Sequence, residues 1–375
     1  MKYIFGAIIF IHGLIHIPGF VKGFGFREVK ELTLPISTPM GILWLVAAGL
    51  IMIYGVVYFA NYRYSWLIGF FVVAVSQILI ILFWKDARFG TFPNIAILAV
   101  SLISYGHYNF QNLVQAETTD LLSQIKIPEN RIVTENDING LPEPVKNWLH
   151  HSGSVGKPYI SAGKVMQKAE MKMKPGQEKW FNATAIQYST IDNPAFIWTV
   201  DVKMNSLINF QGRDKFVNGK GEMLIKLYSL VNVVNEQGEK LNEGTLQRYL
   251  GEMVWFPSLA LSPYITWQEI NDNTATATMN YNGTKGSGTF YFNSDGDFIK
   301  FTALRYMGNE SDAERHEWVL SVDEHKIFEG IKVPSKMTAT WKLENEDWTW
   351  LKLEIQDIKY NENLYKPAGA GIAGP

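Results

Sequence analysis

A charged pair and a second arginine are the residues of this 375-residue chain whose chemistry points most directly to a ligand. Arg248 and Glu252 stand four positions apart, so in a helix they lie on one face and can form an ion pair. If that face looks into the protein, the planar guanidinium of Arg248 can bind a carboxylate or a phosphate. Arg305, followed by Tyr306 in a segment typical of a strand, can do the same from an opposite wall. The alternative is that both arginines pair with Glu252 or stack on tryptophans, and so close the fold.

Large aromatic residues accompany these charges. Tyr249 follows Arg248 directly, and four tryptophans fall in expected strands or at a helix end. Such rings fill the core of a wide sheet, but core and ligand cavity share walls in a curved sheet, so they can also line an apolar cleft. The predicted ligand-binding residues are Trp198, Arg248, Tyr249, Glu252, Trp255, Arg305, Tyr306, Trp318 and Trp341.

Two histidines occur in the first apolar run, in the segment HGLIH. His12 and His16 share one helix face, and neutral imidazoles at this spacing can bind zinc if other helices supply ligands. A haem would need a further partner such as His107. The alternative is hydrogen bonding within a helix bundle, to side chains such as Ser76, Gln77, Asn94 or Ser101. We predict no metal and no other cofactor, and retain a metal or redox role of the histidine pair as an alternative.

Common catalytic motifs are absent from the sequence. It contains no P-loop, no GxGxxG, no GxSxG and no HExxH. The absence of cysteine excludes disulfides, thiolate metal sites and cysteine nucleophiles. A net charge of −2 without a basic stripe argues against a nucleic-acid partner. We therefore predict no catalytic residue, and expect a binding or structural protein rather than an enzyme.

Charge divides the chain into two unlike parts that must position these residues. The stretch up to Phe110 holds seven basic and three acidic residues, which leaves 27 basic and 33 acidic residues for the remainder. Four uncharged apolar runs fill the first part, each long enough, or nearly so, for a helix of ~20 residues that crosses a bilayer. They are residues 3–21, 40–60, 66–84 and 92–108. We predict a four-helix transmembrane region over residues 1–110.

Lysines and arginines in the short loops predict the orientation of this region. The loops after the first and third runs carry Lys22, Arg27, Lys30, Lys85 and Arg88, whereas the opposite side carries Lys2 and Arg63. Basic loops stay in the cytoplasm. We therefore expect a multi-pass protein of a bacterial inner membrane, with the C-terminal part outside the cytoplasm.

Alternating polarity characterises the second part. After a linker over residues 111–140, about eleven short segments alternate polar and apolar residues, which is typical of half-buried antiparallel strands. One helical segment, 244–261, interrupts them. A long antiparallel meander with one covering helix predicts a mainly β domain over residues 141–365, built as a curved sheet or half-barrel. Residues 366–375 are expected to form a flexible tail.

Several motifs of this second part resemble those of a known family. They are Arg248-Tyr249-Leu250-x-Glu252-x-x-Trp255-x-Pro257, then Arg305-Tyr306, and finally Ile358-Lys359-Tyr360-Asn361. Together they resemble a family of uncharacterised bacterial membrane-anchored proteins, for which no activity is established. The expected fold is also similar to the half-barrel of periplasmic lipoprotein carriers, and this likeness implies a lipid-sized apolar cavity. Those carriers lack the four membrane spans predicted here.

A function follows from these expectations. The membrane region places the β domain near membrane lipid, and the aromatic residues and arginines suit a lipid or another amphiphilic ligand. We predict a membrane-anchored protein that binds such a ligand outside the cytoplasm. The alternatives are a structural or sensory module that binds an envelope protein partner, and a membrane metal or redox protein that uses His12 and His16.

Overall fold

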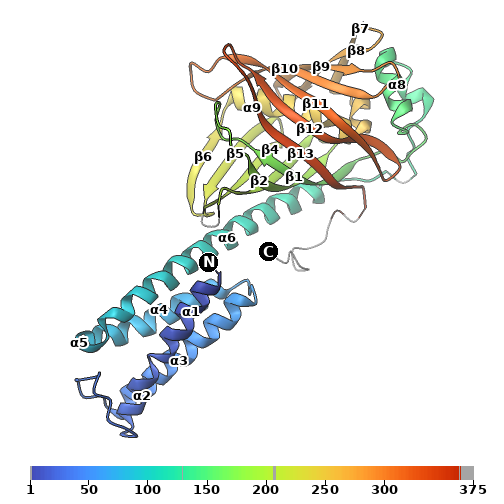
Figure 1. Ribbon diagram of the computed structural model, residues 1–375. Helices are drawn as coiled ribbons and strands as arrows, with labels where there is room; N and C mark the ends of the chain where they lie inside the picture. The colour runs from blue at the N-terminus through green and yellow to red at the C-terminus, as the bar shows by residue number, and fades with distance from the viewer. Residues whose placement is uncertain (1, 129, 206–207, 363, 365–375) are drawn as a thin grey trace. The chain divides into compact units, whose positions relative to one another are not determined.

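The computed structural model describes residues 2–128, 130–205, 208–362 and 364. The chain divides into two compact units, and the first comprises residues 1–112 together with 228–230. The second comprises residues 113–227 and the described residues from Val231 onward. The division falls within one long helix, α6 (Thr91–Ser123) (Figure 1). The predicted tail over residues 366–375 lies outside the described residues.

Apolar helices build the first unit. They are α1 (Lys2–Leu14), α2 (Ile17–Gly23), α3 (Thr38–Phe59), α4 (Ser65–Leu82), the short α5 (Trp84–Ala87), a 3-10 turn η1 (Arg88–Gly90) and α6. By length and composition, four stretches can cross a membrane: Lys2–Gly23, Thr38–Phe59, Ser65–Leu82 and Trp84–Ser123. The prediction of four membrane-crossing helices is therefore confirmed at the level of helix length and composition.

The first of these stretches is interrupted rather than continuous. Pro18 occupies the first turn of α2, where its missing N–H is not needed. Gly19 lets this helix approach α3 closely, because a Cβ at Gly19 would lie only 2.2 Å from the indole of Trp44. Close packing of this kind is typical of membrane helices, whose interfaces are enriched in small residues.

Thirteen strands form one antiparallel sheet in the second unit, in the order β6-β5-β4-β3-β2-β1-β13-β12-β11-β10-β9-β8-β7. The first six are β1 (Ala162–Met171), β2 (Phe181–Thr190), β3 (Ala195–Lys203), β4 (Asn209–Val217), β5 (Lys220–Leu227) and β6 (Val231–Gln237). The others are β7 (Ile265–Asn271), β8 (Thr274–Tyr281), β9 (Thr284–Phe292), β10 (Phe298–Tyr306), β11 (Arg315–Phe328), β12 (Ile331–Lys342) and β13 (Asp347–Tyr360). The predicted antiparallel fold is confirmed.

Two strands exceed the number predicted from the sequence. The segment 221–234 is not one strand, because the chain turns between β5 and β6 at Tyr228 and Ser229, whose φ angles are 53° and 58°. Strand β7 was not predicted. It is an edge strand that is exposed along most of its length, so it lacks the alternation of a half-buried strand.

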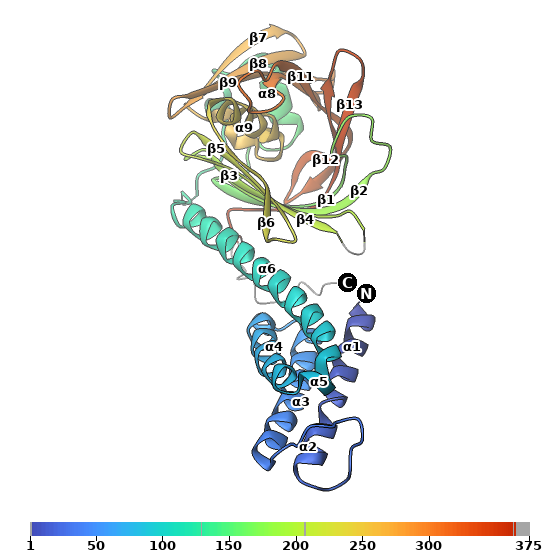
Figure 2. The ribbon, with the colours of Figure 1, turned by 90° about the vertical axis from the view of Figure 1, so that its left-hand side faces the viewer.

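The covering helix α9 (Glu239–Gly251) lies inside the curve of the sheet. Figure 2 shows it enclosed between the β3–β5 side and the β8–β9 side. The helix begins earlier than the predicted segment 244–261, and it changes to 3-10 turns at η2 (Glu252–Trp255) and η3 (Pro257–Leu261). Pro257 explains the break between the two 3-10 turns, because a proline disfavours helical geometry in the residue before it; Phe256 has φ −134° and ψ 67°.

The core of the second unit lies between α9 and the concave face of the sheet. Leu246, Tyr249 and Leu250 of α9 and Met253 of η2 are fully buried there. Turns from the two halves of the sheet also meet, since the hydroxyl of Thr284 donates a hydrogen bond of 2.6 Å to a carbonyl of the β4–β5 turn. The sheet therefore curls into a half-barrel that α9 fills.

Two short helices, α7 (Glu135–Ile138) and α8 (Glu143–His151), precede the sheet. The end of α6 packs on the sheet surface opposite α9, where Leu121 contacts Ala195 and Ile197 of β3. Residues 111–123 of the predicted linker thus belong to α6.

Candidate functional site

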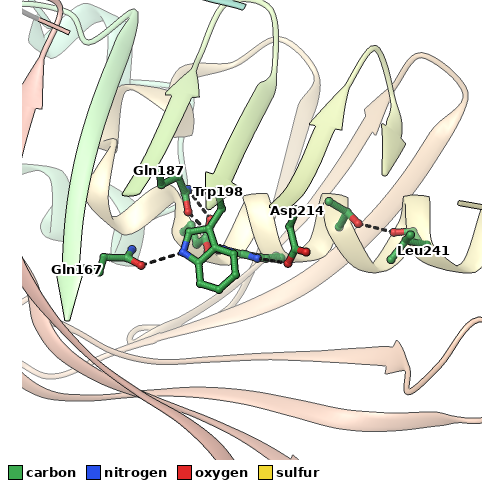
Figure 3. A network of polar contacts seen from close by, with 8 residues as sticks. Gln167, Gln187, Trp198, Asp214 and Leu241 are labelled. Carbon is green, nitrogen blue, oxygen red and sulfur yellow. Dashed lines mark hydrogen bonds and ion pairs between the residues drawn. The ribbon is translucent and has the colours of Figure 1, made fainter. Parts of the chain in front are cut away.

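Arg248 lies at the centre of a buried polar cluster between α9 and the sheet. Its Nε donates to Glu252 at 2.8 Å, one turn further along the chain. Its terminal nitrogens reach Asp214 Oδ2 at 2.8 Å and Gln187 Oε1 at 3.4 Å. Figure 3 shows Gln187, Trp198 and Asp214 gathered on this network. Protein acceptors therefore already occupy the guanidinium of Arg248.

Strand register explains why these side chains converge. Gln187 pairs with Trp198 across β2 and β3, and Trp198 pairs with Asp214 across β3 and β4. Residues directly opposite each other in neighbouring strands share one face of a sheet. Trp198 donates from Nε1 to Gln167 Oε1 at 2.9 Å, and its ring lies 4.6 Å from the guanidinium of Arg248.

The charges in this cluster are matched. Gln187 donates to the second carboxylate oxygen of Glu252 at 2.7 Å, so both oxygens of that buried group have partners. Burial lowers the pKa of Arg248, but Glu252 and Asp214 outweigh it and raise the pKa above its usual value. These contacts correspond to the alternative in which the arginine closes the fold, and a ligand-binding role for Arg248, Glu252 and Trp198 stays a prediction.

Arg305 of β10 has a different environment. Its guanidinium lies 4.1 Å from the ring of Trp318 and 5.6 Å from that of Trp341. Among the described residues, no carboxylate oxygen lies within 4.0 Å of an Arg305 nitrogen, which is the limit for an ion pair. The Nε of Arg305 also has no hydrogen-bond partner there. Burial lowers the pKa of Arg305 to about 9, and the charge of Arg248 contributes to that shift. The side chain therefore remains a cation at neutral pH without a direct counterion among the described residues.

Tryptophans form a wall beside Arg305. Trp318 of β11 is directly opposite Trp341 of β12, which is opposite Trp348 of β13. The indole nitrogens of Trp318, Trp348 and Trp350 are buried and have no acceptor among the described residues. We call Arg305 with these four tryptophans the arginine–tryptophan wall. Trp348 and Trp350 were not among the ligand-binding residues predicted from the sequence, although their i, i+2 spacing at the start of β13 was a usable signal.

The remaining predicted residues lie elsewhere. Tyr249 donates from its hydroxyl to the carbonyl of Thr190 at 2.6 Å, and Trp255 donates to the carbonyl of Pro334 at 3.1 Å; both tyrosine and tryptophan are buried in the core. Tyr306 follows Arg305 in β10. The side chains of Lys240, from α9, and of Arg315 lie over its ring, at 4.9 and 4.3 Å. A ligand-binding role for these three residues stays a prediction.

A hollow of about 320 Å³ opens at a different place, beside the end of α6. The turns after β2 and β4 contribute to its lining, which consists of Leu121, Gln124, Ile125, Lys126, Ser161, Thr190, Asp192, Asn193, Pro194, Ala195, Val217, Asn218 and Tyr281. None of the predicted ligand-binding residues lines it.

The histidines of the first helix belong to a hydrogen-bonded network. His16 Nδ1 lies 2.8 Å from the carbonyl of His12, so it carries the proton and its Nε2 accepts from Ser76 at 3.0 Å. His12 Nε2 lies 2.8 Å from Asn94 Oδ1, and Asn94 in turn donates to Gln77 at 3.0 Å. These contacts correspond to the bundle-packing alternative. Across the described residues no group of three or more His, Cys, Asp or Glu side chains could hold a metal ion.

The fold and the site together define a protein with four apolar helices and an antiparallel half-barrel, with an arginine on the concave face whose Nε has no partner among the described residues. Residues 131–353 match the model of the "Family of unknown function (DUF6544)". Because this match covers more than half of the chain, the protein belongs to that family. The predicted membership of an uncharacterised family is confirmed.

Among solved structures, the chain is similar to a LolA superfamily protein from Nitrosomonas europaea, with a TM-score of 0.34 and 8% sequence identity. The similarity covers 58% of this chain and 94% of that chain. At this TM-score it supports no conclusion about a ligand. No curated protein matches the chain.

Proposed function

We propose that the half-barrel binds a lipid or another amphiphilic molecule at the arginine–tryptophan wall. The observation that carries this proposal is Arg305, a cation held among indole rings with no carboxylate in contact among the described residues. A cation in such surroundings is costly to maintain without a partner. An amphiphile supplies both parts of a partner, a polar head for the guanidinium and an apolar body for the rings.

Two further features support the proposal. Arg305, Trp348 and Trp350 are only half-buried, so the wall borders solvent at these residues, outside the packed core under α9. The four apolar helices are long enough to hold the chain in a bilayer, where amphiphiles are concentrated.

The proposal is tested on the full-length protein, purified in an uncharged detergent. Native mass spectrometry is expected to detect a co-purified amphiphile, and titration with cis-parinaric acid is expected to give saturable fluorescence. Arg305→Ala should weaken both signals. If the folded wild-type protein carries no amphiphile and binds no parinaric acid, the proposal is wrong.

An envelope protein partner is a second candidate function, favoured by the edge strand β6. Val231 and Val233 of this strand are 60% and 55% exposed, although valines are more often buried. An edge strand presents unpaired backbone groups that can pair with another chain. Cross-linking from a photoreactive residue at position 233 is expected to recover one stoichiometric partner if this candidate is right, and no single partner if it is wrong.

A further inference from the structure

We propose that the arginine–tryptophan wall selects an anionic oxygen head group, a carboxylate or a phosphate, over an uncharged one. This inference rests on the proposed function and names the chemical class of its ligand. It is carried by the kind of polar atoms that the wall presents.

The wall offers hydrogen-bond donors and no acceptor. A guanidinium and an indole N–H can only donate. Four such nitrogens are buried without a partner among the described residues: Nε of Arg305 and Nε1 of Trp318, Trp348 and Trp350. A hydroxyl or amide head would leave its own N–H or O–H groups without acceptors at this surface. A carboxylate or phosphate presents only acceptors, so every contact can be satisfied.

Three of these donors, those of Arg305, Trp318 and Trp348, belong to one face of the sheet. Ala303 is opposite Trp318, and Arg305 follows Ala303 by two residues, so it shares the face of Trp318 and its cross-strand neighbours Trp341 and Trp348. This face is the concave one, because a Cβ added at Gly244 of α9 would lie 3.3 Å from the guanidinium of Arg305. A side chain larger than glycine at that position would press on the arginine.

Three charged side chains act on Arg305 from a distance: Arg248 lowers its pKa, whereas Glu252 and Asp214 raise it. Glu252 and Asp214 are both ion-paired to Arg248, at 2.8 Å each, and neither contacts Arg305. Arg248 is itself a cation, and it is the charge with the largest electrostatic effect on Arg305. An anion in direct contact with Arg305 would form a charge-assisted hydrogen bond, the strongest type available there.

The test compares ligands that share one alkyl chain and differ in the head group. Full-length protein in an uncharged detergent is titrated with a fatty acid, the alkyl phosphate and the fatty alcohol, and quenching of tryptophan fluorescence reports binding. We expect the acid or the phosphate to bind at least tenfold more tightly than the alcohol. Comparison of the two anions separates a fatty-acid carboxylate from a lipid phosphate as the source of the head group.

Variants assign the preference to Arg305. Arg305→Gln should bind the anion and the alcohol alike, whereas Arg305→Lys should keep part of the preference. Lys300→Gln is the matched control, because Lys300 lies on the same strand, rests 4.0 Å from the ring of Tyr291 and faces away from the wall. This control should retain the full preference, and circular dichroism verifies that each variant is folded.

The outcomes separate the inference from the proposed function. If the wild-type protein binds the alcohol as tightly as the anions, or if Arg305→Gln keeps the preference, the inference is wrong while amphiphile binding stands. If none of the three ligands binds to the folded protein, the proposed function itself fails.

Discussion

Two arginines of the half-barrel interior differ in what surrounds them. Arg248 contacts two carboxylates and a glutamine, whereas Arg305 lies against indole rings, beside Gly244 of α9. Removing one partner of a buried ion pair lowers the stability of the fold, because the other partner then remains as a buried charge without a counterion. Arg248 is therefore expected to matter for stability, and Arg305 for ligand binding.

Arg248→Met is expected to lower the free energy of unfolding by about 3–5 kcal/mol, because Asp214 and Glu252 would remain buried without a cation. Chemical unfolding of the full-length protein in detergent, followed by tryptophan fluorescence, measures this change. Lys336→Ala is the control, since its ion pair with Glu324 is on the surface, with side-chain exposures of 45% and 37%. That variant should lose about 0–1 kcal/mol. Equal losses in both variants would contradict the structural role of Arg248.

At the scale of elements, the end of α6 is attached to the outer face of the half-barrel by four charges. Glu117 pairs with Arg213 at 3.1 Å and with Lys215 at 2.9 Å, and Glu222 of β5 contacts both cations at 3.0 Å. The Arg213 side chain is only 6% exposed, so its pairs are shielded from solvent. Side chains alternate between the two faces along a strand. Arg213 therefore pairs with Glu117 of α6 on the outer face, while its neighbour Asp214 pairs with Arg248 of α9 on the concave face.

Glu117→Gln is expected to loosen this attachment and to lower stability by about 1–3 kcal/mol, because a buried charged hydrogen bond is lost. Limited trypsin digestion should then cleave faster at Lys126 and Arg131, in the segment that follows α6. Asp120→Asn removes the same charge from an exposed position of the same helix, and should leave the cleavage rate unchanged. Faster cleavage in Asp120→Asn alone would show that the network does not hold the helix.

At the scale of the whole molecule, the distribution of charge predicts which side of the membrane carries the half-barrel. Loops with five basic residues are expected in the cytoplasm, and the C-terminal part is expected outside. An alkaline phosphatase fused after residue 365 should therefore be active, and a green fluorescent protein fused at the same point should be dark. If the fluorescent protein fusion is bright and the phosphatase fusion is inactive, the orientation is the opposite one and the half-barrel lies in the cytoplasm.

The sequence alone predicted the elements of this protein, because apolar runs and alternating strands are local patterns. It located four helices that are long and apolar enough to cross a membrane and most strands of the half-barrel, but missed the exposed edge strand β7, whose residues follow no such pattern. The two-residue turn at Tyr228 and Ser229 was missed as well, since neither residue type signals a positive φ.

Only the tertiary structure decided which of two similar arginines has a partner. Arg248 and Arg305 looked equivalent in the sequence, where the one visible acid was Glu252. Asp214 and Gln187 reach Arg248 through cross-strand register, and the tryptophans of β11 to β13 reach Arg305 in the same way. These contacts join residues that are far apart in the chain, so the local periodicity of the sequence cannot predict them. Composition and pattern thus determined the fold class, and three-dimensional packing determined where a cation without a counterion lies among the described residues.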